Sequence, residues 1–214
     1  MKTLQATEAL GILRRYAPSE SAAIFAVGVS GNETGGWGRV FGLTGNWGMI
    51  QLGSKTGPFL EVRDCDANGR EYRAKLRVYP DREAGAKDLV DVLFSAKGRK
   101  QTVLPAASSG DFCVAVKAMA ASNYFETRQV TDYLTNVLRW GKKAAGPRPE
   151  IDGMGPVLQH GDVGEQVDRW HQLMGVPAGS IDRGQVKKYQ DLHGIVADGK
   201  VGPQTWAHAL MAAV

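Results

Sequence analysis

The sequence predicts a mainly α (α+β) protein: a helical domain with an inserted β-hairpin, followed by a small three-helix bundle. Apolar residues recur at helical spacing in most segments. One segment, 70–79, alternates polar and apolar residues directly after the turn pair Asn68-Gly69. A stretch rich in glycine and proline, 140–156, then interrupts both patterns. We therefore expect a first domain over 1–140, a linker over 141–156 and a second domain over 157–214.

The first domain is expected to begin with an amphipathic helix from Thr7 to Tyr16, which ends before Pro18. The segment from Ser21 to Ser30 is apolar on nearly all sides, so it should form a buried helix. The β-hairpin is expected within 58–79. Further helices are expected over 82–94, 109–124 and 127–139, and those of the second domain over 163–174, 182–193 and 203–210.

Composition excludes several classes of protein. The 214 residues are 43% hydrophobic and 22% charged, which is ordinary for a globular protein. No apolar run reaches the roughly 18 residues needed to cross a bilayer, and no apolar core follows Lys2, so we expect neither membrane insertion nor a signal peptide. Cys65 and Cys113 are too few for a disulfide scaffold, and free thiols are favoured over a pair. The four histidines lack the spacing of a zinc site, so we expect no metal and no cofactor.

The charge is unevenly distributed. Residues 1–146 hold 20 basic and 14 acidic side chains, a net charge of +6, whereas residues 147–214 hold 6 and 8, a net charge of −2. A basic first part favours a polyanionic partner. Nucleic acid, an anionic membrane surface and the bacterial cell wall all fit this description.

The segment Ser30-Gly-Asn-Glu-Thr-Gly-Gly-Trp-Gly38 places a carboxyl group, that of Glu33, at the end of the apolar helix. A poorly solvated carboxyl group has a raised pKa and can donate a proton near neutral pH. Glycine lets a bulky ligand approach the backbone, and Trp37 offers a flat apolar face for a sugar ring. The alternative is a helix C-terminus with an exposed glutamate.

A second segment, Asn46-Trp-Gly-Met-Ile-Gln51, again combines glycine, an aromatic ring and polar side chains. By itself it favours a simple turn that buries Trp47 in the core. Taken together with the first segment as part of a binding site, however, it gives Asn46, Trp47 and Gln51 as expected substrate-binding residues.

Together with Leu76-Arg-Val-Tyr-Pro80, these two segments resemble the glucosaminidase family of flagellar and autolysin peptidoglycan hydrolases over roughly residues 20–140. The first motif has one extra glycine, and Gly-Met-Ile-Gln is closer to the corresponding motif of lytic transglycosylases and goose-type lysozymes. The resemblance implies a lysozyme-like fold, in which a helical lobe and a hairpin lobe flank a glycan cleft. It also implies that Glu33 is the general acid.

Glycosidases commonly use a second carboxylate, and the resemblance places it on the hairpin before an Asn-Gly turn. Glu61, Asp64 and Asp66 precede Asn68-Gly69 here, and we favour Asp64. The alternative for each is a solvated surface charge. Tyr124 falls where the family has a tyrosine in its cleft, although a core tyrosine fits equally well.

The last part resembles the peptidoglycan-binding domain of cell-wall hydrolases. The matching segments are Leu158-Gln-His-Gly-Asp-Val-Gly-Glu-Gln-Val167, the pair Tyr189-Gln190, and Asp198-Gly-Lys-Val-Gly-Pro-Gln-Thr-Trp206. Gly199 and Gly202 are expected to set a turn, Pro203 to begin the last helix, and Trp206 to pack on Tyr189. With Asp198, these residues define the expected wall-binding module, and the alternative is a generic three-helix bundle.

These resemblances predict an endolysin-type peptidoglycan hydrolase that cleaves the glycan backbone as a monomer. The lack of a signal peptide favours a phage enzyme made in the host cytoplasm that reaches the wall after release. One alternative is a wall-binding structural protein without activity. A second is a nucleic-acid-binding protein, which the −2 charge of residues 147–214 disfavours. Which glycosidic bond is cut, and whether water or the internal 6-hydroxyl is the acceptor, stay open.

Overall fold

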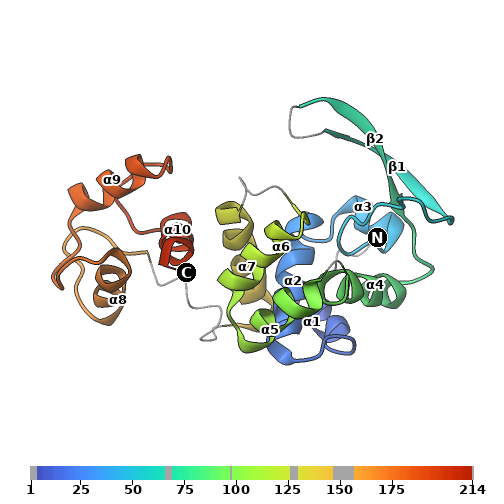
Figure 1. Cartoon of the computed structure of the whole chain (residues 1–214), viewed down its shortest axis with the longest axis horizontal. Coiled ribbons are helices and arrows are strands. Elements are labelled where there is room, and N and C mark those ends of the chain that lie inside the picture. The colour runs from blue at the N-terminus through green and yellow to red at the C-terminus, as the bar shows by residue number, and fades with distance from the viewer. Residues whose placement is uncertain (1–3, 66–68, 97, 126–129, 147–156, 214) are drawn as a thin grey trace. The chain divides into compact units, whose positions relative to one another are not determined.

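The computed structural model describes residues 4–65, 69–96, 98–125, 130–146 and 157–213. Contacts within the chain divide it into two units, Met1–Ile151 and Asp152–Val214. The boundary between them falls inside the segment 141–156. The predicted fold class is confirmed: the described elements are mainly helices, with one two-stranded sheet (Figure 1). Among the described residues, no helix is both long enough and apolar enough to span a membrane.

The first unit contains seven of the helices and both strands. In chain order they are α1 (Ala6–Leu13), α2 (Glu20–Glu33), α3 (Arg39–Thr44), β1 (Phe59–Cys65), β2 (Glu71–Arg77), α4 (Arg82–Phe94), α5 (Arg99–Ser109), α6 (Phe112–Ala121) and α7 (Val130–Ala145).

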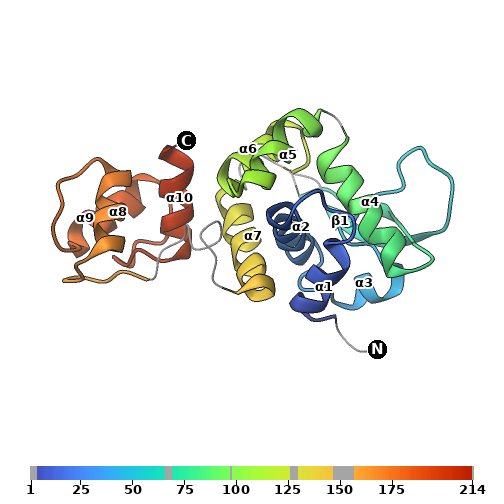
Figure 2. The same ribbon diagram turned by 90° about the horizontal axis from the view of Figure 1, so that it is seen from below.

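Helix α2 is the core of this unit. Its N-terminus is capped by the Ser19 hydroxyl, which accepts a hydrogen bond from the Ala22 N–H. Every residue from 22 to 31 is buried, and α2 packs against α1, α4, α5 and α7, which lie around it (Figure 2). A helix that is apolar on all sides is stable only when it is enclosed in this way.

Two glycines set the distance between α2 and α7. A Cβ atom on Gly28 would lie 2.5 Å from the Val137 carbonyl oxygen, and one on Gly31 would lie 2.4 Å from Cγ of Trp140. These separations are shorter than any real carbon contact. The two helices therefore approach as closely as they do only because both positions lack a side chain.

Strands β1 and β2 form the predicted antiparallel hairpin, which extends away from the helices (Figure 1). Successive side chains point to opposite faces of a sheet. Leu76 pairs with Leu60, Ala74 with Val62, and Tyr72 with Asp64, so these six share one face. Ala74 and Leu76 are buried, which shows that this face is covered at the base of the hairpin. Residues 66–68, and with them Asp66, lie outside the described part, as does the side chain of Cys65.

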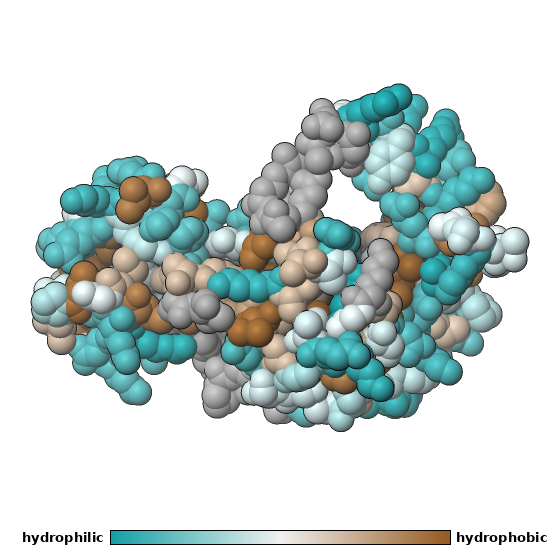
Figure 3. Space-filling view, viewed as in Figure 1, coloured by the Kyte–Doolittle hydropathy of each residue, from teal (hydrophilic) through white to brown (hydrophobic). Residues whose placement is uncertain are grey.

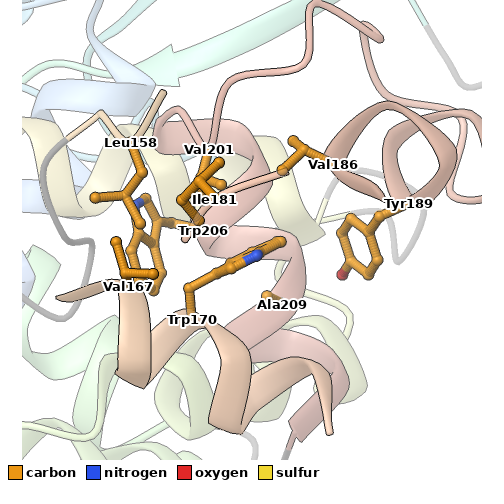
Figure 4. Packing of buried hydrophobic residues seen from close by; sticks show 9 residues of the cluster. All are labelled: Leu158, Val167, Trp170, Ile181, Val186, Tyr189, Val201, Trp206 and Ala209. Carbon is orange, nitrogen blue, oxygen red and sulfur yellow. The ribbon is translucent and has the colours of Figure 1, made fainter. Parts of the chain in front are cut away.

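The second unit contains α8 (Glu165–Met174), α9 (Arg183–Leu192) and α10 (Pro203–Ala213). Backbone hydrogen bonds join Leu158 to Val201 and bring the start of the unit beside the turn before α10. Nine buried residues form its core (Figure 4). The expected packing of Trp206 on Tyr189 is indirect: Trp170 lies edge-on to both rings, at 5.6 and 5.5 Å between centroids.

Several elements differ from the sequence predictions. Helix α4 has the predicted bounds, whereas α3 and α5 were not predicted. Helix α7 continues to Ala145, so residues 141–145 are helical and do not belong to a linker. The segment 147–156 lies outside the described residues.

Candidate active site

Glu33 is the last residue of α2, and its carboxyl group is held from α7. Its Oε1 accepts a hydrogen bond from the Tyr133 hydroxyl at 2.7 Å. Tyr133 is buried, and its ring stacks on Phe125 with the ring planes 1° apart and the centroids separated by 3.9 Å. Glu33 itself is half-buried. The alternative of a freely exposed glutamate at the helix end is therefore wrong.

This environment changes the acidity of Glu33. Burial raises the pKa of Glu33 to about 7 from an ordinary value of 4.5, and the hydrogen bond from Tyr133 opposes part of that rise. Removal from water disfavours the charged form of a carboxyl group, whereas a donated hydrogen bond favours it. The last carbonyl groups of α2 lie at the negative end of the helix dipole and act in the same direction as burial. Glu33 can therefore carry a proton at neutral pH and release it.

Sequence reasoning missed Tyr133, although it contacts the candidate acid. It lies on the buried face of the helix predicted over 127–139, and its hydroxyl needs a partner in that position. That need was the available signal, but the partner is 100 residues away in the chain.

Trp37 packs in the core, which corrects the expectation that it offers an open face to a sugar. It is 2% exposed, its indole N–H donates to the Ser30 hydroxyl at 3.0 Å, and its ring meets Trp140 edge-on. Gly35, Gly36 and Trp37 all have positive φ angles, which turn the chain back toward α2. A Cβ atom on Gly36 would lie 2.4 Å from the Trp140 ring, so this glycine serves packing, whereas a Cβ atom on Gly35 would meet nothing within 4 Å.

The segment from Asn46 to Gln51 is a tightly bonded loop. The Asn46 side chain donates to the carbonyl groups of Ile50 and Arg77, and it accepts from the Ile50 N–H at 2.8 Å. Asn46 and Trp47 are fully buried, and the Trp47 indole N–H donates to the Arg82 carbonyl. Both residues shape the loop and the core, so the expected contact of Asn46 and Trp47 with substrate is corrected.

The same loop fastens the hairpin to the helices. The Arg77 N–H donates to the Ile50 carbonyl, and the Leu52 N–H donates to the Lys75 carbonyl at 2.7 Å. Gln51 pairs with Leu76 as an isolated bridge. The loop therefore lies along β2 and fixes the base of the hairpin.

Gln51 and Asp64 are brought together through Tyr72. The Gln51 side-chain amide donates to the Tyr72 hydroxyl at 3.3 Å, and this hydroxyl donates to Asp64 Oδ2 at 2.8 Å. The side chains of Gln51 and Asp64 are exposed. Asp64 lies on the hairpin face whose base is covered. The surface is hollowed between the hairpin and the helices (Figure 3).

Glu61 is placed differently. It belongs to the opposite face of the hairpin, where it forms a 2.6 Å ion pair with Arg73. Side-chain alternation turns Glu61 away from the face that carries Asp64 and the buried side chains of Ala74 and Leu76.

Tyr124 lies between the loop and Arg99. A Cβ atom on Gly48 would lie 3.2 Å from its hydroxyl oxygen, and the Arg99 guanidinium lies 5.0 Å from the centre of its ring. Burial, and then the charge of Glu33, raise the pKa of Tyr124. Its buried hydroxyl has no hydrogen-bond partner among the described residues. The position is compatible with both expectations, a cleft residue and a core residue.

In the second unit, the expected wall-binding residues stabilise the fold. Trp206 is fully buried. Asp198 Oδ1 accepts hydrogen bonds from the Lys200 N–H and then from the Gln190 side chain, and these bonds lower the pKa of Asp198. Gly199 has a φ of 76° and donates its N–H to Gln190, while a Cβ atom on Gly202 would meet nothing within 4 Å. Trp206 and Gly199 are therefore buried parts of the fold, whereas Asp198 is exposed.

No protein-family model and no curated protein matches the chain in sequence. Among solved structures, the catalytic domain of the autolysin Auto from Listeria monocytogenes resembles it with a TM-score of 0.46 and 15% identity. The alignment covers 66% of this chain and 82% of that one. A likeness of this degree does not establish a shared activity.

Proposed function

We propose that the first unit is a glycosidase that cleaves the glycan backbone of bacterial peptidoglycan, with Glu33 as its general acid. The observation that carries the proposal is the half-buried carboxyl group of Glu33, whose pKa is about 7 and whose Oε1 is bonded to Tyr133. A general acid works best when its pKa lies near the working pH. The segments around Glu33 and Gln51, with their resemblance to glucosaminidases, supply the substrate class.

In this reaction, Glu33 donates its proton to the glycosidic oxygen as the bond to the departing sugar breaks. The remaining sugar develops oxocarbenium-like positive charge. Asp64 is the candidate to stabilise this charge, because Tyr72 and Gln51 fix its position on the covered face of the hairpin. The N-acetyl group of the substrate is the alternative stabiliser.

The second unit is proposed to bind the wall and so to hold the enzyme at an insoluble substrate. This proposal is supported by the sequence pattern over residues 158–206, which lies in a compact three-helix unit. A phage endolysin acting as a monomer on the wall after release is the setting that we propose for the whole chain.

The test is lysis of purified cell walls by the full chain and by Glu33→Gln. The variant keeps the oxygen that accepts from Tyr133 but cannot donate a proton as a carboxylic acid does. It should lose about 10²–10⁴-fold in rate. A variant that keeps more than about a tenth of the parent rate would refute the role of Glu33.

Asp64→Asn and Glu61→Gln form a matched pair for the hairpin. We expect a large loss for Asp64→Asn and little change for Glu61→Gln, which removes only an exposed ion pair. Mass spectrometry of the products would identify the bond that is cut and the acceptor. A parent protein that binds walls and leaves every glycan intact would favour an inactive wall-binding protein.

A further inference from the structure

A cavity of about 570 Å³ with several charged residues in its wall lies on the first unit, and Glu33 is not among its lining residues. It is bounded by the loop after Ile50, the end of β2, the C-terminal half of α4 and the first residue of α5. Among the residues that the structure describes, the lining includes three basic and two acidic side chains and no aromatic ring: Lys55, Arg77, Arg99, Asp88 and Asp91 carry the charges.

Two of these charges neutralise each other. Arg77 Nη1 forms a 2.5 Å ion pair with Asp88 Oδ2, and the Tyr79 hydroxyl donates to the same oxygen. This ion pair connects the end of β2 to α4. The other three charged side chains of the lining have a net charge of +1.

Arg99 is a buried cation whose bonding is incomplete. It is 3% exposed, its Nε donates to the Ser122 hydroxyl at 2.7 Å, and its Nη1 donates to the Val92 carbonyl. Within the described part of the chain, its other terminal nitrogen has no hydrogen-bond partner and no carboxylate forms an ion pair with it. A buried guanidinium without an anion is costly, and it suits a bidentate carboxylate.

Lys55 and Asp91 line the same cavity and are exposed. Among the described residues, neither side chain has an ion-pair partner within 4 Å. As far as the described residues show, two cations and one anion of the cavity wall therefore have no ion-pair partner in the protein.

Two lining residues of the cavity are in contact with residues next to the candidate active site. Ile50 lines it and is held by Asn46, in the loop that carries Gln51. The Arg99 guanidinium lies over the Tyr124 ring, and the Glu33 charge acts on that tyrosine. One aromatic ring therefore lies between the cavity wall and the neighbourhood of Glu33.

We infer that this cavity binds the peptide stem of the substrate, with a stem carboxylate on Arg99 and Lys55 and a stem ammonium on Asp91. The inference rests on the proposed function for its substrate class. The sugars of a peptide-bearing glycan are uncharged and leave the three charges unmatched. The stems carry free carboxylates together with an ammonium group on the dibasic residue, and these complement the cavity.

The experiment measures peptide binding without cleavage. Full-length Glu33→Gln protein is titrated calorimetrically with the tripeptide N-acetyl-L-alanyl-γ-D-glutamyl-meso-diaminopimelate, which has no glycosidic bond and, because its alanine amine is acylated as in the wall, a single free amine. Lys55→Ala and Asp91→Asn, each added to that protein, should weaken binding about two- to fivefold, as expected for exposed charge pairs. Lys87→Ala is the matched control, since Lys87 is exposed on α4 and does not line the cavity.

Modified peptides identify the partner groups. Acetylation of the free amine should remove the difference between the parent and Asp91→Asn, and amidation of the carboxylates should do so for Lys55→Ala. Arg99→Lys, with its fold checked by circular dichroism, should lose more affinity than either exposed variant because it loses the fork geometry.

The two proposals fail in different ways. Absence of tripeptide binding, or binding that Lys55→Ala and Asp91→Asn leave unchanged, would overturn the stem site even if the parent enzyme cuts glycan. Binding that depends on both residues, in a chain whose parent cuts no glycan, would keep the stem site and overturn the glycosidase.

Discussion

The chemistry of the candidate site depends on one carboxyl group whose pKa is subject to two opposing effects. Burial raises the pKa of Glu33, and the Tyr133 hydroxyl lowers it. The first effect is the larger, so the group is poised near neutrality. Both effects come from α7 and the core, not from the glycines that follow Glu33 in the chain. Gly35 and Gly36 turn the chain through their positive φ angles, and Gly36 leaves room for the Trp140 ring.

Removing the Tyr133 hydroxyl should change the pH dependence of lysis. Tyr133→Phe loses the hydrogen bond that stabilises the Glu33 carboxylate, so the pKa of Glu33 rises further. The acid then keeps its proton to higher pH, and the falling limb of the pH–rate profile should move upward. Tyr16→Phe is the control, because Tyr16 donates to Glu83. A limb that stays in place in Tyr133→Phe would contradict this role.

The raised pKa of Glu33 also makes the stability of the protein depend on pH. The folded protein holds the Glu33 proton more tightly than the unfolded chain, so stability is fullest below pH 4.5 and falls as the pH rises toward 7. At 1.36 kcal/mol per pKa unit, the loss is about 3 kcal/mol. Glu33→Gln cannot ionise. Urea unfolding should therefore show similar stabilities at pH 4 and a more stable variant at pH 8, whereas parallel profiles would count against the burial.

At the scale of the element, the contact between α2 and α7 positions the acid beside Tyr133. Gly28→Ala should destabilise the first unit by about 1–3 kcal/mol, since the new methyl group meets the Val137 carbonyl, which is backbone and cannot move aside. Gly11→Ala is the matched control in α1, where a Cβ meets nothing within 4 Å. It should stabilise by about 0.5–1 kcal/mol through helix propensity. If Gly28→Ala and Gly11→Ala changed the free energy of unfolding by urea equally, the close approach of α2 and α7 would be unimportant.

The elements that the sequence predicted correctly are those with local signals. Helix α4 has an amphipathic pattern and an aspartate, Asp81, whose side chain caps the Ala84 N–H. The hairpin was predicted from side-chain alternation beside Asn68-Gly69. Helix α5 was missed because it has little amphipathic pattern and contains Pro105, which ordinarily ends a helix.

The candidate site was predictable only in part, because only some of its residues give a local signal in the sequence. Glu33 was found because a carboxyl group at the end of an apolar helix is unusual in itself. Trp37 and Trp47 were assigned to substrate because an aromatic ring in a glycine-rich segment fits both a sugar platform and a packed turn. Only the tertiary contacts, with Ser30 and Arg82, distinguish these roles.

At the scale of the whole molecule, the two units differ in charge and in the work proposed for them. The first carries the net positive charge and the candidate acid, whereas the second has its own core around Trp170 and Trp206. Its signature residues hold that core together. Of the expected wall-binding residues, Trp206 and Gly199 are buried and Asp198 is exposed, so Asp198 is the charged side chain among them that remains accessible to a wall polymer.

Separating the units tests this division of labour. Residues 157–214 alone should sediment with insoluble peptidoglycan, and residues 1–146 should still cleave short soluble glycans at nearly the parent rate. On whole walls the truncated enzyme should be slower, because it lacks the second point of attachment. Its +6 charge partly compensates through attraction to anionic walls, so the deficit should grow between low and high salt as that attraction is screened. A folded fragment of residues 1–146 that fails on soluble glycans would instead mean that the second unit takes part in cleavage.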